Sequence, residues 1–358
     1  MKVKWYYFNM SKDLGRKYRR RLTLEENESL DRSRGIQEQS DSHNMRVEDV
    51  KHLWVKNQNS SVFVKNPNFI SPEDTGVIDA VKEALSSMKG HEPKFPILKR
   101  KTGKDKRLLV VDPADIHIGK LAEKVETGED YDNNIAVQRV MEGVDGILNE
   151  SNPDRIDKIL FVGGNDILHV DNTKRSTTAG TSQDTVGMWH SNFLIAKDLY
   201  VKVLETLISV ADVHFVFNPS NHDYTQGYFL AQVIETYFRK CKNITFDCSI
   251  QHRKYFRYFN NIIGCTHGDG AKTTDLPLLM AHEAPKDWAE TKHRYVYTHH
   301  VHHKVSKDYM SVNVESLRTP SGTDAWHDRN GYSHNVKAVE GFLHHKEHGQ
   351  LQRITHIF

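Results

Sequence analysis

Five short polar clusters, each lying directly after an apolar run rich in β-branched residues, constrain this chain more than any other feature. Apolar runs of this length between turn residues are typical of buried strands. The ends of such strands are where α/β sheets present their active-site groups. In chain order the clusters are Asp115-Ile116-His117, Asn165–His169, Asn221-His222-Asp223, Thr266-His267-Gly268 and His300-Val301-His302. One cluster would mean little, but five in succession predict a metal site.

The segments around the clusters predict alternating strands and helices, and therefore an α/β fold. Strands are expected at residues 108–111, 158–162, 213–217, 262–265 and 295–297. Apolar residues at helical spacing predict helices over 135–148, 192–210 and 229–238. A hairpin is expected around Asn260-Asn261, later strands at 310–314 and around His348-Gly349, and a long loop over the site at 171–187.

The residue types in the clusters indicate which ions they would bind. Carboxylate, imidazole and amide oxygen suit a hard-to-borderline divalent ion, and we expect Mn²⁺, with Mg²⁺, Fe²⁺ and Zn²⁺ as alternatives. A thiolate site is not expected, because only Cys265 of the three cysteines lies near a cluster. Two ions roughly 3.5–4 Å apart are a recurring device for displacement at phosphorus. The candidate ligands, enough for two ions, are Asp115, His117, Asp166, Asn221, His267, His300 and His302.

The order of the clusters resembles that of the calcineurin-like metallophosphoesterases, whose pattern is D-x-H, G-D, G-N-H-D or G-N-H-E, a lone His, and G-H-x-H. The match covers residues 107–305. The resemblance implies a four-layer α/β/β/α sandwich and a two-metal phosphoesterase. It implies one ion on Asp115, His117 and His302, a second on Asn221, His267 and His300, Asp166 as their bridge, and His222 beside the phosphate as proton donor or charge stabiliser for the leaving oxygen.

Three positions depart from the family's pattern. Asn165, Ser220 and His299 stand where the family has glycine. Asn tolerates left-handed backbone geometry, whereas Ser and His do so less readily. The departures bear on the conformation of the loops and leave every expected ligand in place.

The second cluster indicates a branch of that family. The protein phosphatases of the family carry D-x-x-D-R-G, whose Arg grips a phosphomonoester, but here Asp166 is followed by His169 and no Arg. This is similar to the double-strand-break-repair nucleases, in which a His at this place helps to position the scissile phosphodiester. The alternative for His169 is a residue that only caps or packs. Asp223 is expected to orient His222 and not to bind metal.

Length, charge and cysteine content limit the class of protein. A chain of 358 residues has room for one large domain and an appendage. The net charge of +2 argues against a polycation, and no apolar run approaches the ~20 residues of a membrane span. Three cysteines without C-x-x-C spacing, and a start without signal-peptide features, predict a reduced, cytoplasmic protein. The oligomeric state stays open, with a dimer as one option.

Residues 1–105 are expected to form a basic accessory region ahead of a metallophosphoesterase domain over 106–358. Residues 1–21 contain eight cations against one anion, and a second basic run lies at 94–107. Residues 50–67 predict a β-hairpin and residues 74–88 a helix. The basic segments could hold a nucleic acid by its phosphates, and a solvated tail is an equal alternative.

These features predict a two-metal phosphodiesterase, specifically a DNA nuclease that hydrolyses phosphodiester bonds with metal-activated hydroxide. Within enzymes the alternative is a phosphomonoesterase, or a phosphodiesterase of small or cyclic nucleotides. From another class the alternative is a non-catalytic scaffold, such as a polymerase accessory subunit. The complete set of candidate ligands argues against a scaffold.

Overall fold

The computed structural model describes residues 107–332 and 335–358, together with residues 95–100, residue 105 and short stretches at 36–37, 40–41, 46–47, 50–56, 61–66 and 69. The chain divides into two units, residues 1–91 and residues 92–358. The basic segment 1–21 and the helix expected over 74–88 lie outside the described residues.

The first unit contains the expected hairpin. β1 (His52–Lys56) pairs antiparallel with β2 (Ser61–Lys65). The side-chain amide of Asn66 donates to the carbonyl oxygens of Val47 and Val50, at 2.9 Å each. These two bonds tie the end of the hairpin to the chain that enters it, and the prediction of a hairpin over 50–67 is confirmed.

A six-stranded sheet forms the first layer of strands in the second unit. Its order is β13 (Gly349–Ile357), β12 (Ala338–His345), β3 (Arg107–Asp112), β4 (Ile156–Gly164), β5 (Asp212–Asn218) and β6 (Ile244–Asp247). The four strands from β3 to β6 are parallel, whereas β12 runs antiparallel to β3 and β13. The connecting helices are α4 (Asn133–Glu150), α5 (Trp189–Val210) and α6 (Tyr224–Phe238).

A five-stranded sheet forms the second layer. Its order is β10 (Val305–Tyr309), β11 (Val312–Ser316), β9 (His293–Thr298), β8 (Asn261–Thr266) and β7 (Arg253–Tyr258). Helices α7 (Leu276–Glu283) and α8 (Pro285–Glu290) connect β8 to β9. Short helical turns occur at α3 (Lys124–Thr127), η2 (Pro153–Arg155) and α9 (Ala325–Arg329).

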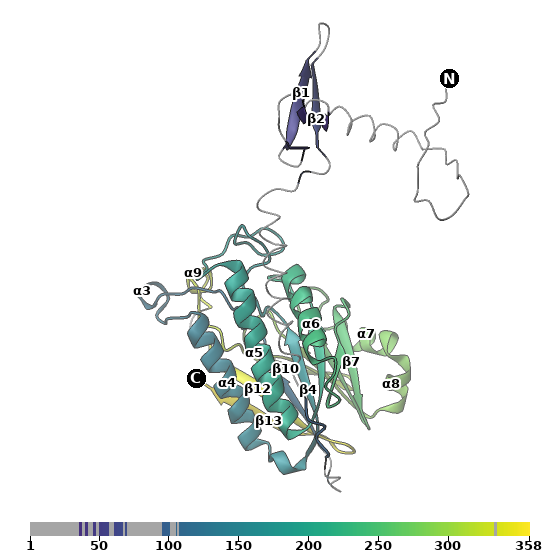
Figure 1. Ribbon diagram of the computed structural model, residues 1–358. Coiled ribbons are helices and arrows are strands. Elements are labelled where there is room, and N and C mark those ends of the chain that lie inside the picture. The colour runs from purple at the N-terminus through teal and green to yellow at the C-terminus, as the bar shows by residue number, and fades with distance from the viewer. Residues whose placement is uncertain are drawn as a thin grey trace, which may run out of the picture. The chain divides into compact units, whose positions relative to one another are not determined.

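Alternating side chains on the strands explain why the two sheets stack. On β3, Leu109 and Val111 join the core under the helices, whereas Leu108 and Val110 join a second core with Ile263 and other residues of the five-stranded sheet. A third core lies between the outer face of that sheet and α7. Figure 1 shows α4, α5 and α6 side by side over the first sheet, and α7 and α8 beside β7. The α/β/β/α layering is confirmed.

The expected core strands and helices are confirmed, with one correction at the edge of the second sheet. Residues 310–314 were expected to form a strand, but Met310 lies in a turn with φ of 55° and β11 begins at Val312. The strand before this turn, β10, escaped prediction because its residues Val305–Tyr309 are mostly polar and exposed. Edge strands lack the apolar alternation that reveals half-buried ones.

Residues 95–100, which precede β3, pack against the rest of the second unit. The ring of Phe95 lies 5.2 Å from that of Phe238, and the backbone N–H of Leu98 donates to Asn243 at 3.2 Å. Arg100 forms an ion pair of 3.0 Å with Asp212. None of the helices in the described ranges combines the length and apolar character that a bilayer span requires.

Candidate metal centre

The loops that follow β3, β4, β5, β8 and β9 meet at one edge of the two sheets, because parallel strands end on the same side. The backbone N–H of Asp115 donates to the carbonyl of Asn165 at 2.8 Å, which joins the first two loops. The backbone N–H of His299 donates to the carbonyl of His267 at 2.8 Å, which joins the last two. The fold therefore brings all five sequence clusters together.

Left-handed backbone conformations mark these loops. Such conformations cost non-glycine residues roughly 1–3 kcal/mol each, and they persist only where the surrounding contacts fix them. Asn165 adopts such a left-handed conformation, with φ of 51°. Asn tolerates this conformation better than most residues do, so Asn can replace the glycine of the family's pattern here. Six residues of the five sequence clusters have φ between 51° and 73°: Asp115, His117, Asn165, Asp166, His300 and His302.

Asp115, His117 and His302 form the first group of candidate ligands, and their ligand atoms all lie within 4.8 Å of one another. Nε2 of His302 lies 3.4 Å from Nε2 of His117 and 3.4 Å from Oδ1 of Asp115. All three side chains are buried. Burial lowers the pKa of both histidines, that of His117 strongly, so both imidazoles are neutral near pH 7.

Asp166, His267 and His300 form the second group, and Asn221 joins it. Nε2 of His267 lies 2.9 Å from Oδ1 of Asn221 and 3.2 Å from Oδ2 of Asp166. Burial opposes protonation of His267, but the carboxylate of Asp166 prevails and raises the pKa of this imidazole to about 9. Metal ligation requires a neutral imidazole, so a cation here would displace that proton.

A third group links the first one to the expected catalytic histidines. Ligand atoms of His117, His169 and His222 lie within 4.8 Å of one another, and Nδ1 of His169 is 3.3 Å from Nδ1 of His117. His117 thus belongs to two of these groups, whereas Asp166 belongs, in the part of the chain that the structure describes, to the group of His267 and His300 alone. The bridging role of Asp166 stays a prediction.

Three contacts fix the orientation of half-buried His222. Its Nδ1 lies 2.9 Å from the carbonyl oxygen of His169, and since a carbonyl only accepts, Nδ1 carries the hydrogen. The backbone N–H of His222 donates to Oδ1 of Asp166 at 2.9 Å. Its ring also stacks on that of His169, with 5.3 Å between the centroids. Among the described residues Nε2 makes no hydrogen bond, and it is the nitrogen that stays available.

The donor set fits divalent cations. Among the described residues, the buried carboxylates of Asp115 and Asp166 have only histidines as charge partners, and the proton on His267 that serves as their counter-charge would leave on metal ligation. A buried carboxylate without a counter-charge is costly, and a cation removes that cost. Carboxylate, amide oxygen and imidazole are also the ligands that Mn²⁺, Mg²⁺, Fe²⁺ and Zn²⁺ accept.

Asp223 has partners other than the expected one. Its Oδ1 accepts from the hydroxyl of Ser220 at 2.7 Å, and its Oδ2 accepts from the backbone N–H of Leu168 at 2.9 Å. The hydroxyl of Ser220 in turn accepts from the backbone N–H of Asp166 at 2.7 Å. Within the described structure Asp223 makes no hydrogen bond to His222. Asp223 and Ser220 therefore fasten the second loop to the third.

His299, which replaces a glycine of the family's pattern, is a buried link between the sheets. Its Nε2 lies 3.0 Å from each carboxylate oxygen of Asp112, at the end of β3. Its Nδ1 lies 3.1 Å from the carbonyl oxygen of Thr266, at the end of β8. Burial raises the pKa of Asp112, which therefore depends on this histidine as its partner. The pair joins the strands directly behind Asp115 and His300.

Residues 323–332, here called the 323–332 strap, lie beside the first group and were missed by sequence reasoning. The ring of His327 stacks on that of His302, with 5.0 Å between centroids and 15° between planes. Asp324 contacts Nδ1 of His327 at 2.7 Å and Nζ of buried Lys120 at 2.8 Å. Lys120 stands three residues after His117, but neither it nor the strap belongs to a strand-end cluster, so no pattern pointed to them.

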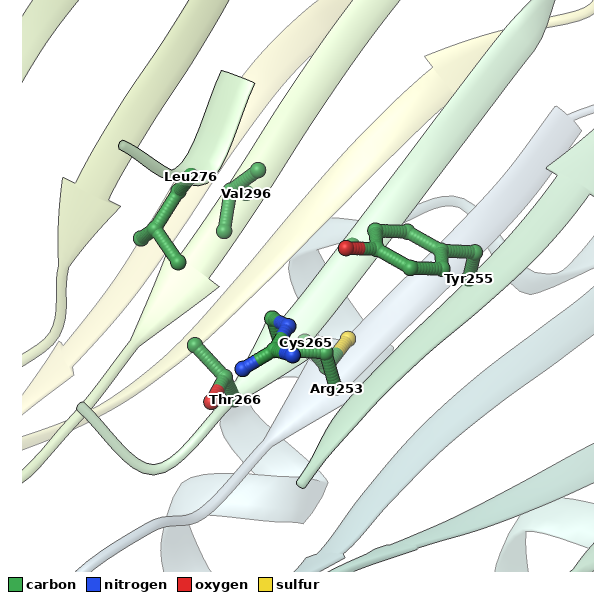
Figure 2. A pocket seen from close by; sticks show the side chains of 7 residues that line it. Arg253, Tyr255, Cys265, Thr266, Leu276 and Val296 are labelled. Atoms are coloured by element: carbon green, nitrogen blue, oxygen red, sulfur yellow. The ribbon is translucent and has the colours of Figure 1, made fainter. Parts of the chain in front are cut away.

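A crevice in the second sheet is lined by none of the candidate ligands. Its lining comes from β7, β8, β9 and α7 and includes Arg253, Tyr255, Cys265 and Leu276 (Figure 2). The crevice has no room for a water molecule. Burial also raises the pKa of the Cys265 thiol far above its usual range, so the thiolate is not available as a ligand.

Comparisons with known proteins found likeness in structure alone. No protein-family model matches the chain, and no curated protein matches it by sequence. An archaeal phosphodiesterase aligns at 8% identity and a TM-score of 0.34, over 70% of this chain and 99% of that one. Vps29 from Entamoeba histolytica, complexed with Zn²⁺, aligns at 12% identity and a TM-score of 0.31, over 70% and 98%. A predicted phosphoesterase from Streptococcus pneumoniae aligns at 11% identity and a TM-score of 0.26, over 70% and 97%.

At these identities and TM-scores the likeness carries no weight for what this chain acts on. Its activity is therefore inferred from the residues of the site.

Proposed function

We propose that this chain is a phosphodiesterase that works with two divalent cations, Mn²⁺ in the first instance, and that its substrate is a polynucleotide, DNA above all. The observation that carries the proposal is the convergence of two buried carboxylates, an amide and several histidines, in which the carboxylates have only histidines as charge partners among the described residues. When bound, the cations activate water and offset negative charge on the phosphate. Asp115, His117 and His302 would bind one cation, and Asn221, His267 and His300 would bind the other. Asp166 would bridge the two cations.

His222 is placed to assist the leaving oxygen. Its Nδ1–H is held by the carbonyl of His169, so a proton can be donated only from Nε2 and only by the imidazolium form. The positive charge of that form also faces the negative phosphate. Asp166 accepts the backbone N–H of His222, which couples the position of this catalytic residue to the ligand group.

The residue at position 169 supports a diester as substrate. A phosphomonoester offers three free oxygens, which arginine grips in a bidentate manner. Here the position holds His169, buried 3.3 Å from His117 and stacked on His222. A phosphomonoesterase, a hydrolase of small or cyclic nucleotides and a non-catalytic scaffold remain the alternatives.

Charge outside the second unit supports DNA as partner. Residues 1–21 contain eight cations on a chain whose net charge is only +2. Cations gathered on one segment hold a polyanion by its phosphates and release its counterions. Residues 106–358 are proposed as the catalytic domain and residues 1–105 as the accessory region, of which residues 92–105 belong to the second unit.

The proposal is tested with bis-p-nitrophenyl phosphate as a generic diester. Protein dialysed against EDTA should be inactive, and Mn²⁺ should restore hydrolysis. Asp166→Asn should abolish turnover, since it removes charge from the ligand group. His222→Ala should lower kcat roughly 10²-fold or more while metal content stays near that of the wild type, because general acids contribute about 10²–10⁴.

His214→Ala is the matched control, because His214 is a histidine of β5 outside all three ligand groups. Hydrolysis that persists in excess EDTA would refute the metal assignment. Faster turnover of p-nitrophenyl phosphate than of the diester would favour the monoesterase. Bound metal without any hydrolysis, in a panel that includes single-stranded DNA, duplex DNA, RNA and cyclic nucleotides, would favour the scaffold.

A further inference from the structure

The 323–332 strap presents two exposed aromatic side chains. Trp326 is 61% exposed and Tyr332 is 51% exposed. Their rings lie 6.0 Å apart with 24° between the planes, so they stack on each other in the open. Large aromatic side chains dominate cores and binding surfaces, where their area is covered. A stacked, uncovered pair is therefore a surface suited to a planar ligand.

The pair lies one imidazole ring away from the first ligand group. His327 stacks on His302 at 5.0 Å, and the ring of Trp326 meets that of His327 edge-on at 5.1 Å. The ring of Tyr332 also meets that of His327 edge-on, with 6.4 Å between the centroids. A phosphate at the metal groups and a base on the pair would thus belong to the same nucleotide or to adjacent ones.

The strap is held firmly enough to present these rings. Asp324 caps α9 by accepting the backbone N–H of His327 at 2.8 Å, and it pairs with buried Lys120 at 2.8 Å. The backbone N–H of Tyr332 donates to the carbonyl of His327 at 2.9 Å. Asn330 donates to the carbonyl of Trp326 at 2.8 Å. A surface fixed before binding loses less entropy when the ligand arrives.

We propose that Trp326 and Tyr332 form a stacking platform for a nucleobase next to the scissile phosphate, and that the substrate is an unpaired stretch or end of a polynucleotide. This inference rests on the proposed phosphodiesterase function and narrows its substrate class. Every base has a π-face, so such a platform binds without sequence preference. A base inside a duplex already stacks on its neighbours, so the platform favours single strands.

Two diesters with the same leaving group test the platform: the p-nitrophenyl ester of thymidine 5′-monophosphate and ethyl p-nitrophenyl phosphate. The measured quantity is the ratio of their kcat/KM values with Mn²⁺, nucleoside over ethyl. Base–aromatic stacking gives the expected scale, and Trp326→Ala and Tyr332→Ala should each lower this ratio about fivefold or more. Trp326→Phe should keep most of the ratio, because phenylalanine still stacks.

Phe259→Ala is the matched control, since Phe259 is 50% exposed in the turn between β7 and β8, at the opposite end of those strands from His267. It should keep the wild-type ratio. A ratio unchanged in both alanine variants overturns the platform while leaving the phosphodiesterase intact.

Binding separates failure of the platform from failure of the proposed function. Fluorescence anisotropy of labelled oligothymidylate, measured in EDTA with the full chain, needs no turnover. Affinity should fall in Trp326→Ala, and an abasic strand of equal length should bind wild type and variant alike. If the wild-type protein hydrolyses neither diester, the proposed function is refuted. The comparison of oligothymidylate affinities then tests the stacking platform by itself. Equal affinity of wild type and Trp326→Ala for oligothymidylate would then overturn it.

Discussion

Replacing His299 by alanine should destabilise the fold more than any exposed histidine replacement, because His299 joins the two sheets behind the candidate metal centre. The variant lacks the imidazole whose Nε2 lies 3.0 Å from each carboxylate oxygen of Asp112 and whose Nδ1 lies 3.1 Å from the Thr266 carbonyl. The carboxyl of Asp112, which is fully buried, then remains in the core without its histidine partner.

The size of the effect follows from the cost of a buried charge. Removing the partner of a buried carboxylate costs about 3–5 kcal/mol. Burial already raises the pKa of Asp112, so in the variant this carboxyl can take up a proton and the cost falls toward the lower end. We expect the free energy of unfolding to fall by about 3 kcal/mol in His299→Ala. Asp112→Asn keeps a hydrogen-bonding group and should be destabilised by about 1 kcal/mol.

Urea unfolding in EDTA, followed by circular dichroism, measures these changes without linkage to metal binding. His282→Ala, an exposed histidine of α7, should change the free energy of unfolding by no more than about 0.5 kcal/mol. The double-mutant cycle of Asp112→Ala and His299→Ala should give a coupling energy of about 1–3 kcal/mol. A coupling energy near zero would refute the pair as a structural link.

Three further predictions concern other parts of the chain. Asp223→Ala should lower the free energy of unfolding by about 2–3 kcal/mol, because the Leu168 N–H and the Ser220 hydroxyl are left without their buried acceptor, and equal melting curves for variant and wild type would contradict this. Burial lowers the pKa of His344 to about 3 against about 6.5 in the unfolded chain, so the unfolded state binds the proton first and stability falls as pH decreases from 6.5 toward 3. Urea midpoints in EDTA should show a destabilisation of about 2 kcal/mol from this group at pH 5, which His344→Gln should remove. Deleting residues 1–21 should weaken DNA binding and flatten the log–log salt dependence by about 0.9 for each DNA phosphate that the segment neutralises, and an identical slope would reduce the segment to a solvated tail.

The layered core could be predicted from the sequence because its signal is local. On β3 and β4 the apolar runs are continuous, since both faces of a central parallel strand are buried. The candidate ligands follow these runs directly, so their meeting at one edge follows from the parallel order. β10 gave no such signal, because an exposed edge strand needs no apolar face.

The connections between the loops could not be predicted, because they depend on which side chains meet across the fold. Ser220 and His299 were expected only to complicate loop geometry, yet each uses its side chain to tie two segments together. Asp223 was expected to orient His222 and instead bonds Ser220 and Leu168. The sequence pattern shows the order of the polar residues along the chain. Which partners these residues contact depends on how the loops pack in the folded protein.

The 323–332 strap shows the same limit at greater sequence distance. Asp324 and His327 reach Lys120 and His302 from a segment that follows β11, beyond the residues that the family resemblance covers. No apolar periodicity or strand end marks the strap, so only the folded chain reveals that it adjoins the candidate metal centre.

The most direct measurement is the number and coupling of Mn²⁺ ions bound by the full chain. Elemental analysis after gel filtration, with electron paramagnetic resonance on the same sample, should give two Mn²⁺ per chain with spin-coupled spectra, as expected for ions about 3.5–4 Å apart. Asp166→Asn should remove the coupling. One ion per chain, none, or two ions with uncoupled spectra in the wild type would contradict a two-metal centre bridged by Asp166.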